Sequence, residues 1–406
     1  MGLGLTMWFP LNGQGANKER YQNYFQHLSS IVPSWKTNSF FDDKGFRVKL
    51  VPFEEDVYGT WEEERLCISA KTNSAGPGYH AYLIDLLDGL GIAPVEVEDE
   101  TGYYGNRDFV SLQEEMTKWL RGLSEQILKM SAGGKYKNLA VSLSIDCFPE
   151  DSGHLACCPL GYFEREFFAK AQKGKAGGAE FFIWWNQPQD AMFFKNTALN
   201  LIWCENNWLP PETELEHEII AATLACLEKA YALEPGTDYP AAEWTELARL
   251  SRDELLEQKL HSRFGSSGEA RLGYKQGFVT HNIYGWRVTA NGKMHFDREE
   301  DGSLVWWDDV RTIRATAFSV ELKEGADSES LLQSATRSEE NCDPFTLRNP
   351  KIAASIQHDH IEENGEPLFQ TRLTAALDDK LLILSLFYVH AADRDWAIKV
   401  SASVAR

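Results

Sequence analysis

The sequence predicts an α+β protein: an N-terminal mixed-sheet α/β domain followed by a smaller antiparallel α-β sandwich. In the first part, strand-like and helix-like runs are mixed without strict alternation. After a Gly/Ser-rich linker at 264–268, short strand-like runs follow one another with Asn-Gly and Asp-Gly turns between them. We therefore expect a mixed α/β acidic domain over 1–240, a helical connector and linker over 241–274, and an antiparallel-sheet sandwich domain over 275–406.

The first region has six strand candidates, because short β-branched and apolar runs are bounded there by turn residues. They span 47–53, 65–71, 94–98, 138–147, 180–185 and 198–204. Helices are expected where apolar residues recur at i, i+3 and i+4 or follow a capping box. These helices span 79–90, 111–130 after a box at Ser111 and Glu114, 213–233 after a box at Thr213 and Glu216, and one or two stretches within 240–265.

The second region consists mostly of short strand-like runs separated by turn residues, as in a sheet protein. Strands are expected over 281–290, 294–298, 303–307, 312–322, 353–361, 368–377 and 380–389, with helices over 328–337 and 391–404. Four strands, a helix, three strands and a helix predict one antiparallel sheet with helices packed on it. This element order resembles the PsbP/Mog1-type α-β sandwich. The resemblance implies a fold used mainly by small binding and assembly proteins, and it constrains function weakly.

Composition excludes several classes of protein. The 406 residues include 40 Lys and Arg against 61 Asp and Glu, a net charge of −21, which excludes a general nucleic-acid binder because phosphate recognition needs a basic surface. No apolar run is long enough to span a membrane. The seven cysteines are odd in number and spread along the chain, and no secretory signal is recognisable, so we expect reduced thiols and a cytoplasmic location.

The acidic residues are clustered. Residues 1–265 hold 39 of the 61 acidic side chains and 24 of the 40 basic ones. A run of acids usually forms a solvated surface, but a field of one sign also steers an oppositely charged partner. We expect a partner-binding surface formed by Glu54, Glu55, Asp56, Glu62, Glu63, Glu64, Glu96, Glu98, Asp99 and Glu100.

The loop from Ser74 to Gly78 leads from a predicted strand into a predicted helix. Its N–H groups and the helix dipole suit an anion, so Gly76, Gly78, Tyr79 and His80 are ligand-binding candidates. The loop lacks the Lys-Ser/Thr of a P-loop and the spacing GxGxxG. Glycines that serve only a tight turn are the alternative interpretation.

His358 and His360 are weak metal-ligand candidates, because side chains at i and i+2 of a strand share one face. A third ligand is needed, and the alternative is an exposed polar strand. No metal or other cofactor is predicted.

Two function classes stay open. We favour a cytosolic acidic protein-interaction module, with an immunity- or inhibitor-type role against a basic partner. The alternative is a metal-dependent or other hydrolase near the Gly76–Gly78 loop or His358 and His360.

Overall fold

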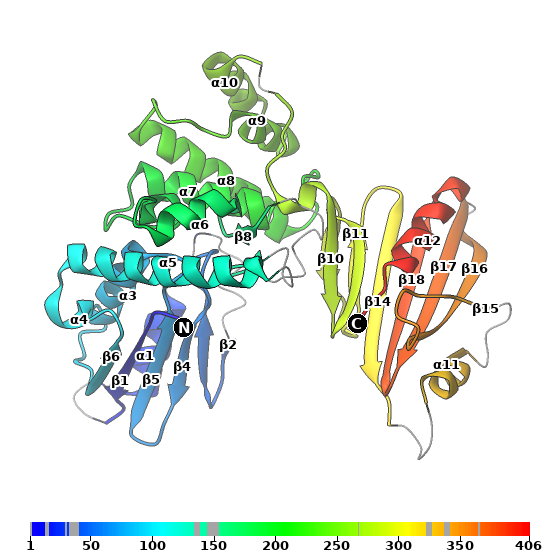
Figure 1. The fold of residues 1–406 in the computed structure, drawn as a ribbon, viewed down its shortest axis with the longest axis horizontal. Helices are drawn as coiled ribbons and strands as arrows, with labels where there is room; N and C mark the ends of the chain where they lie inside the picture. Colours follow the sequence, from blue (N-terminus) through cyan, green and yellow to red (C-terminus); the bar gives the residue numbers. More distant parts are fainter. Residues whose placement is uncertain are drawn as a thin grey trace. The chain divides into compact units, whose positions relative to one another are not determined.

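The computed structural model describes residues 2–12, 16–28, 31, 40–133, 139–143, 154–266, 268–321, 327–336, 342–363 and 366–406. The chain forms two compact units. The first holds most of the chain up to Gly273, and the second holds Asn207–Leu209 and Tyr274–Arg406. Helices and antiparallel sheets occur in both units (Figure 1), so the α+β fold class is confirmed.

The first unit is built on a six-stranded sheet with the order β2-β3-β4-β5-β1-β6. All five neighbouring pairs are antiparallel. Next to the edge strand β6 lies β1, which the sequence did not reveal, and next to β1 lies β5, which is confirmed as predicted. The strands are β1 (Gly4–Pro10), β2 (Phe40–Phe41), β3 (Gly45–Val48), β4 (Val57–Trp61), β5 (Arg65–Lys71) and β6 (Glu96–Asp99).

Strict alternation gives this sheet a buried face and an outer face. In β1 the buried residues are Leu5, Met7 and Phe9, and the residues between them are partly exposed. Helix α1 (Lys18–Gln26) packs on the buried face, because Tyr21 on α1 lies with its ring centroid 6.2 Å from that of Phe9. On the outer face Tyr58 is 45% exposed. The outer face is therefore open to solvent around this residue.

Helices form most of the rest of the first unit (Figure 1). A small sheet of β7 (Leu139–Ala140), β8 (Ala156–Cys158) and β9 (Gly161–Phe163) lies among them, and its β7–β8 pair is parallel. The strand predicted over 138–147 is described only at residues 139–143, of which Leu139 and Ala140 form β7; residues 138 and 144–147 lie outside the described residues. The helices are α3 (Pro77–Asp88), α4 (Tyr103–Asn106), α5 (Phe109–Ala132), α6 (Arg165–Gln172), α7 (Ala191–Cys204), α8 (Glu214–Leu233), α9 (Ala241–Leu250) and α10 (Glu254–Phe264), with a 3-10 turn at Gly178–Glu180.

Three predictions for this unit need comment. The strands predicted over 180–185 and 198–204 are wrong, because the first stretch is irregular after the 3-10 turn and the second lies in α7. Helix α5 begins after Asp108, whose carboxylate accepts from the N–H groups of Val110 and Ser111, so the cap predicted at Ser111 is also wrong. The capping box at Thr213 is confirmed.

The second unit contains a seven-stranded antiparallel sheet with the order β12-β13-β14-β18-β17-β16-β15. A separate hairpin, β10–β11, and helix α12 pack with it around one core that includes Trp286, Leu384 and Val400. The elements are β10 (Phe278–Ile283), β11 (Trp286–Asn291), β12 (His295–Arg298), β13 (Leu304–Trp307), β14 (Arg311–Ser319), α11 (Ser328–Thr336), β15 (Asp343–Pro344), β16 (Ala353–Glu363), β17 (Glu366–Leu377), β18 (Lys380–Tyr388) and α12 (Arg394–Ala402), with 3-10 turns at Tyr274–Gln276 and Ala391–Asp393.

Two details of the second unit differ from expectation. The strand predicted over 281–290 is interrupted at Tyr284 and Gly285, whose positive φ angles turn the chain back into a hairpin. Consequently Asn291-Gly292 leads from one sheet to another, whereas Asp301-Gly302 does join the paired strands β12 and β13.

No helix in the described part of the chain is long and apolar enough to cross a membrane.

Candidate functional site

The pleat of β6 divides the predicted acidic run at 96–100 between two environments. Glu98 pairs with Thr6 and Glu96 with Trp8, so both carboxylates lie on the outer face of the sheet and are exposed. Asp99 points the other way, and its side chain is only 4% exposed. With the exposed Glu100, this run therefore supplies three surface charges and one buried carboxylate, Asp99, which does not belong to the exposed acidic surface that the sequence predicted.

The outer face contains a hollow of about 470 Å³. Its floor follows one row of paired residues across four strands, because Tyr58 pairs with Ser69, Ser69 with Thr6, and Thr6 with Glu98. The two inner members of the row are small, and the two outer members are large. The hollow is lined by Gly4, Leu5, Thr6, Glu55, Tyr58, Ser69, Ala70, Lys71, Glu98 and Glu100.

Acidic groups outnumber basic ones around this hollow. Lys71 is paired with Glu55, with 2.9 Å between Nζ and Oε1, but Glu98 and Glu100 add two carboxylates to the same rim. One Glu100 oxygen accepts from the N–H of Gly4 at 2.8 Å, which fixes the side chain. The hollow therefore has a local excess of negative charge.

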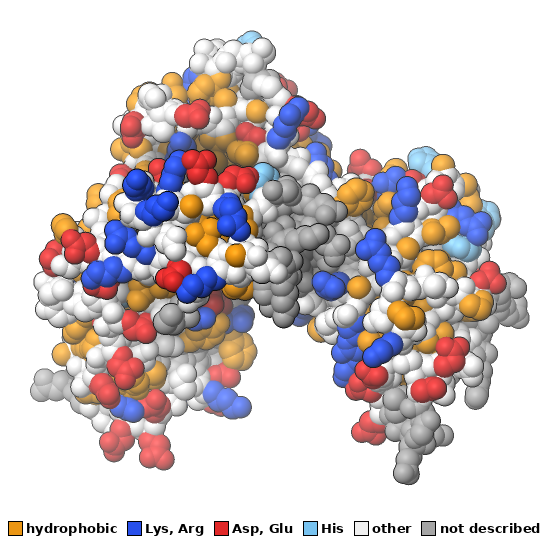
Figure 2. All heavy atoms as spheres, in the orientation of Figure 1, with side chains coloured by type: hydrophobic (Ala, Val, Ile, Leu, Met, Phe, Trp, Pro, Cys, Tyr) orange, Lys and Arg blue, Asp and Glu red, His pale blue; other side chains and the backbone are white. Residues whose placement is uncertain are grey.

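A second acidic group lies at the β4–β5 turn, where Glu63 and Glu64 are exposed. Arg65 contacts Glu62 and also Glu96, the latter with 3.0 Å between Nη1 and Oε2. Asp56 forms an ion pair with Arg47. Such exposed pairs contribute little to stability. Figure 2 shows acidic side chains gathered at the lower end of the sheet in this view.

Glu54 is buried, and it holds the loop that follows β5. Its Oε2 accepts from the backbone N–H groups of Ser74 and Ala75, each at 2.9 Å. Burial raises the pKa of Glu54 to about 7, although these hydrogen bonds act in the opposite direction. The residue is not part of the exposed acidic surface that the sequence predicted.

The Gly76–Gly78 loop is closed by packing against residues 182–186. A Cβ on Gly76 would lie 2.7 Å from Cβ of Phe182, and one on Gly78 would lie 2.0 Å from Cδ1 of Trp184. The N–H of Gly78 donates to the carbonyl of Trp184 at 2.9 Å. Tyr79 is fully buried. The glycines thus allow a close approach between two segments, a packing role that differs from both the anion site and the tight turn considered from the sequence.

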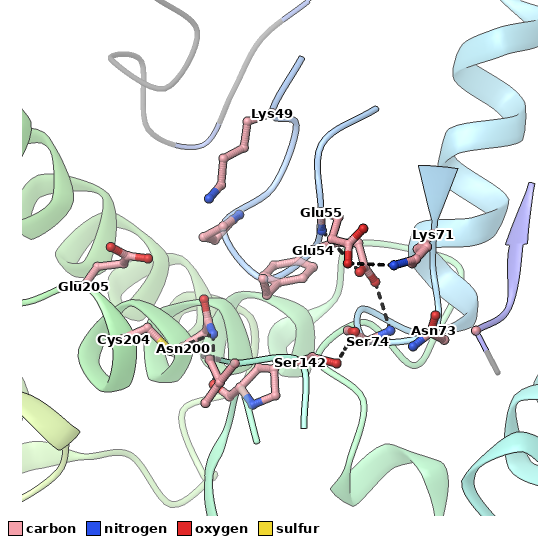
Figure 3. A pocket seen from close by; sticks show the side chains of 15 residues that line it. Lys49, Glu54, Glu55, Lys71, Asn73, Ser74, Ser142, Asn200, Cys204 and Glu205 are labelled. Carbon is pink, nitrogen blue, oxygen red and sulfur yellow. Dashed lines mark hydrogen bonds and ion pairs between the residues drawn. The ribbon is translucent and has the colours of Figure 1, made fainter. Parts of the chain in front are cut away.

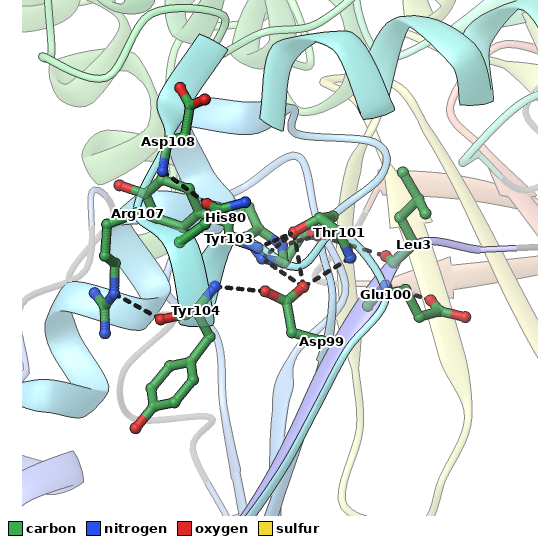
Figure 4. A network of polar contacts seen from close by, with 12 residues as sticks. Leu3, His80, Asp99, Glu100, Thr101, Tyr103, Tyr104, Arg107 and Asp108 are labelled. Carbon is green, nitrogen blue, oxygen red and sulfur yellow. Dashed lines mark hydrogen bonds and ion pairs between the residues drawn. The ribbon is translucent and has the colours of Figure 1, made fainter. Parts of the chain in front are cut away.

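His80 is the centre of a buried polar network (Figure 4). Its Nδ1 lies 2.9 Å from the hydroxyl of Thr72, and its Nε2 lies 3.1 Å from that of Thr101 and 3.2 Å from Oδ1 of Asp99. A hydroxyl, an imidazole and a carboxylate in sequence are typical of nucleophilic catalysis. Here Thr72 and His80 are both fully buried, so the network connects α3 to β5 and β6 rather than presenting a nucleophile.

His358 and His360 share one face of β16, as predicted, but His358 is engaged within the second unit. Its Nδ1 lies 2.9 Å from the hydroxyl of Thr371, which lies 3.1 Å from the hydroxyl of Tyr388. Burial and the nearby charge of Arg394 lower the pKa of His358. Among the residues that the structure describes, no group of three or more His, Cys, Asp or Glu side chains could hold a metal ion.

Sequence reasoning missed the neutral residues of the outer hollow. Thr6 and Ser69 form its floor and Tyr58 its side. The alternation in Gly4–Pro10, with Leu5, Met7 and Phe9 at every second position, is a strand signal that would have placed Thr6 on a solvent-facing row. The pairing that brings Glu98 beside it depends on long-range register, which no local pattern contains.

No family model and no curated protein matches the chain. A crystal structure of a protein from Bacteroides thetaiotaomicron aligns with a TM-score of 0.27 and 12% identity, over 32% of this chain and 48% of that one. The solution structure of cyanobacterial PsbP from Synechocystis aligns with a TM-score of 0.19 and 9% identity, over 35% of this chain and 98% of that one. This chain thus spans about half the length of the Bacteroides protein. With TM-scores this low, we infer nothing about function from either structure.

Proposed function

We propose that the protein is a cytosolic interaction module that binds a basic protein partner through the outer face of its six-stranded sheet. An immunity- or inhibitor-type protein that neutralises a basic toxin or nuclease is the concrete form of this proposal. The observation that carries it is the hollow between Tyr58 and Glu98, because its shape and its charge both fit a basic side chain.

The row of paired residues gives the hollow its dimensions. Three strand spacings separate Tyr58 from Glu98, which corresponds to about 14 Å between their backbones. A lysine or arginine side chain lying over Ser69 and Thr6 would place its alkyl part on small residues. Its charged end would reach the carboxylates of Glu98 and Glu100, and a second cationic side chain of the partner would lie over the Tyr58 ring at the other end of the row. A cation near a tyrosine face gains about 0.5 to 2 kcal/mol.

The surrounding charge supports the same occupant. Exposed Glu63 and Glu64 and the hollow lie on one sheet, within the part of the sequence that has most of the acidic excess. A field of one sign raises the association rate of an oppositely charged protein, and the effect weakens as salt screens it. Binding should therefore be fast at low ionic strength and should fall steeply as salt is added.

A labelled oligoarginine peptide can serve as the probe. Its affinity for the full chain is measured by fluorescence anisotropy at about 50 and 500 mM NaCl, two conditions that differ strongly in screening length. Glu98→Gln combined with Glu100→Gln should weaken binding about tenfold at low salt, as expected when two charge contacts are lost. Tyr58→Ala should weaken it further.

The matched control removes two carboxylates elsewhere. Glu114→Gln combined with Glu300→Gln changes the net charge by the same amount at two exposed positions that do not line the hollow. This variant should bind the peptide nearly as well as the unmodified chain. Equal losses for both pairs would mean that only net charge matters, and binding that is insensitive to salt would also contradict the proposal.

A further inference from the structure

A second hollow in the first unit differs in chemistry from the outer face. It is a cavity of about 640 Å³, a size typical of small-molecule sites. Figure 3 shows that its walls come from the segments after β3 and β5, the segment after β7 and helix α7. The cavity is lined by Gly2, Lys49, Pro52, Phe53, Glu54, Glu55, Lys71, Asn73, Ser74, Ser142, Leu143, Pro159, Asn200, Cys204 and Glu205.

Asn200 on α7 presents an unpaired acceptor to this cavity. The side chain is only 2% exposed. Its Nδ2 donates to the carbonyl of Pro159 at 2.9 Å, which fixes the orientation of the amide. Its Oδ1 accepts no hydrogen bond from the described residues. In Figure 3 this oxygen points toward the side on which Lys49 lies. Buried polar atoms are rarely left without a partner.

Asn73 adds a second acceptor of the same kind on the opposite side. It is 9% exposed, and its Oδ1 likewise accepts nothing from the residues that the structure describes. Beside it, the hydroxyls of Ser74 and Ser142 are hydrogen-bonded to each other. Each hydroxyl has a further donor or acceptor capacity for a ligand. Unpaired acceptors therefore lie on both sides of the cavity, and the two hydroxyls lie on the side of Asn73.

Charge around the cavity is nearly balanced. Lys49 and Lys71 face Glu55 and Glu205, and Lys71 is already paired with Glu55. Burial raises the pKa of Glu54 to about 7, so this carboxyl is only partly charged at neutral pH. An anionic ligand would meet carboxylates and amide oxygens, and a cationic ligand would meet two lysines. A neutral ligand avoids both.

We propose that this cavity binds a small neutral polyhydroxylated ligand of the sugar class. A sugar hydroxyl both donates and accepts, so hydroxyls on opposite edges of the ring can donate to the oxygens of Asn200 and Asn73 and accept from Lys49 and the serine hydroxyls. Pro52 and Phe53, which also line the cavity, offer an apolar surface to the C–H face of the ring. The proposal does not depend on partner binding at the outer face.

Two substitutions test the site without removing buried structure. Lys49→Met removes the ammonium on one side. Ser142→Gly removes a hydroxyl on the other, at a residue whose φ of 58° glycine adopts without strain. Neither residue borders the outer hollow. Lys173→Met is the matched control, because Lys173 is exposed and lies outside the cavity.

The full chain is titrated by calorimetry with glucose, galactose, mannose, N-acetylglucosamine and maltose, and with phosphate and citrate as anionic probes. We expect at least one sugar to bind with a Kd below about 1 mM, and each cavity variant to weaken it about tenfold, the change expected for one lost hydrogen bond to a charged or buried group. Lys173→Met should bind unchanged.

Three results would overturn the proposal: no sugar binds the folded chain at about 20 mM, far above the expected Kd; an anion binds in preference to every sugar; or Lys173→Met weakens binding as much as the cavity variants. Circular dichroism of each variant establishes that a loss of binding is not a loss of folding. Failure here would leave the oligoarginine experiment unaffected, because the two sets of variants share no residue.

Discussion

Nε2 of His80 lies 3.2 Å from Oδ1 of Asp99, and both side chains are closed to solvent. The contact joins α3 to the edge strand β6, because His80 is in the first turn of the helix and Asp99 is the last residue of the strand. Asp99 also accepts from the N–H groups of Thr101 and Tyr104. A buried carboxylate with this many donors is a stabilising element that depends on its charge.

Asp99→Asn should lower the free energy of unfolding by about 2 to 3 kcal/mol, because the replacement keeps an acceptor oxygen but loses the charge. Burial alone would raise the pKa of Asp99, but the hydrogen bonds from His80, Tyr104 and Thr101 hold it well below its usual range. A lowered pKa stabilises the folded state above the unfolded value of about 3.9, and this contribution is lost as the pH falls further.

The difference in stability between the unmodified chain and Asp99→Asn should therefore be constant above about pH 5 and shrink below pH 4. Urea unfolding at a series of pH values measures it. Glu98→Gln is the control, since Glu98 is the preceding residue but lies on the exposed face. A difference that stays constant into acid would mean that the charge of Asp99 contributes nothing.

Glu54→Gln should change stability with the opposite dependence on pH. Burial raises the pKa of Glu54 to about 7, so the folded state binds a proton more tightly than the unfolded chain does. The stability of the unmodified chain should then fall as the pH rises from about 5 to 8, by about 2 to 3 kcal/mol from this group. Glutamine cannot titrate, so this part of the slope should disappear.

Thermal unfolding between those pH values measures the slope for both proteins. Glu55→Gln is the matched control, because Glu55 is adjacent but exposed. Its slope should equal that of the unmodified chain. If Glu54→Gln keeps the full slope, another group causes it, and Glu54 does not have a raised pKa.

Gly78→Ala should destabilise the first unit by about 2 kcal/mol or more, because the added methyl has no room and overpacking forces neighbours apart. That methyl would lie 2.0 Å from Cδ1 of Trp184. Gly122→Ala is the control within helix α5, where the methyl meets nothing within 4 Å. It should stabilise the protein by up to about 1 kcal/mol. Chemical unfolding of both variants checks the contrast.

The same contact explains which elements could be predicted from the sequence. Helix α3 and strand β5 follow clear local patterns and were predicted. Residues 181–184 are aromatic and apolar like a strand, but all four are buried, and the backbone of Trp184 bonds to a segment far away in the sequence. The N–H of Trp184, for example, donates to the carbonyl of Ala75. A composition suited to a strand was overridden by tertiary packing.

Helix α7 illustrates a second limit. Ten of its fourteen residues are buried, so it has no polar face and no clear helical period. A short apolar run without a period fits a buried strand equally well. The candidate site could not be predicted in full from local sequence patterns either. The acidic residues were visible in the sequence, but the strand register that brings Glu98 opposite Thr6, and the turn that buries Glu54, are long-range consequences of folding.

The two predicted capping boxes provide the last prediction, because one exists and the other does not. Thr213 accepts from the N–H of Glu216, and Glu216 accepts from the N–H of Thr213. Thr213→Ala removes the hydroxyl from this cap and should lower stability by about 1 kcal/mol. Ser111 lies inside α5, where its hydroxyl only donates to the true cap, Asp108. Ser111→Ala should therefore have a smaller effect. Urea unfolding of both variants measures the difference, and equal losses would contradict the assignment of the caps.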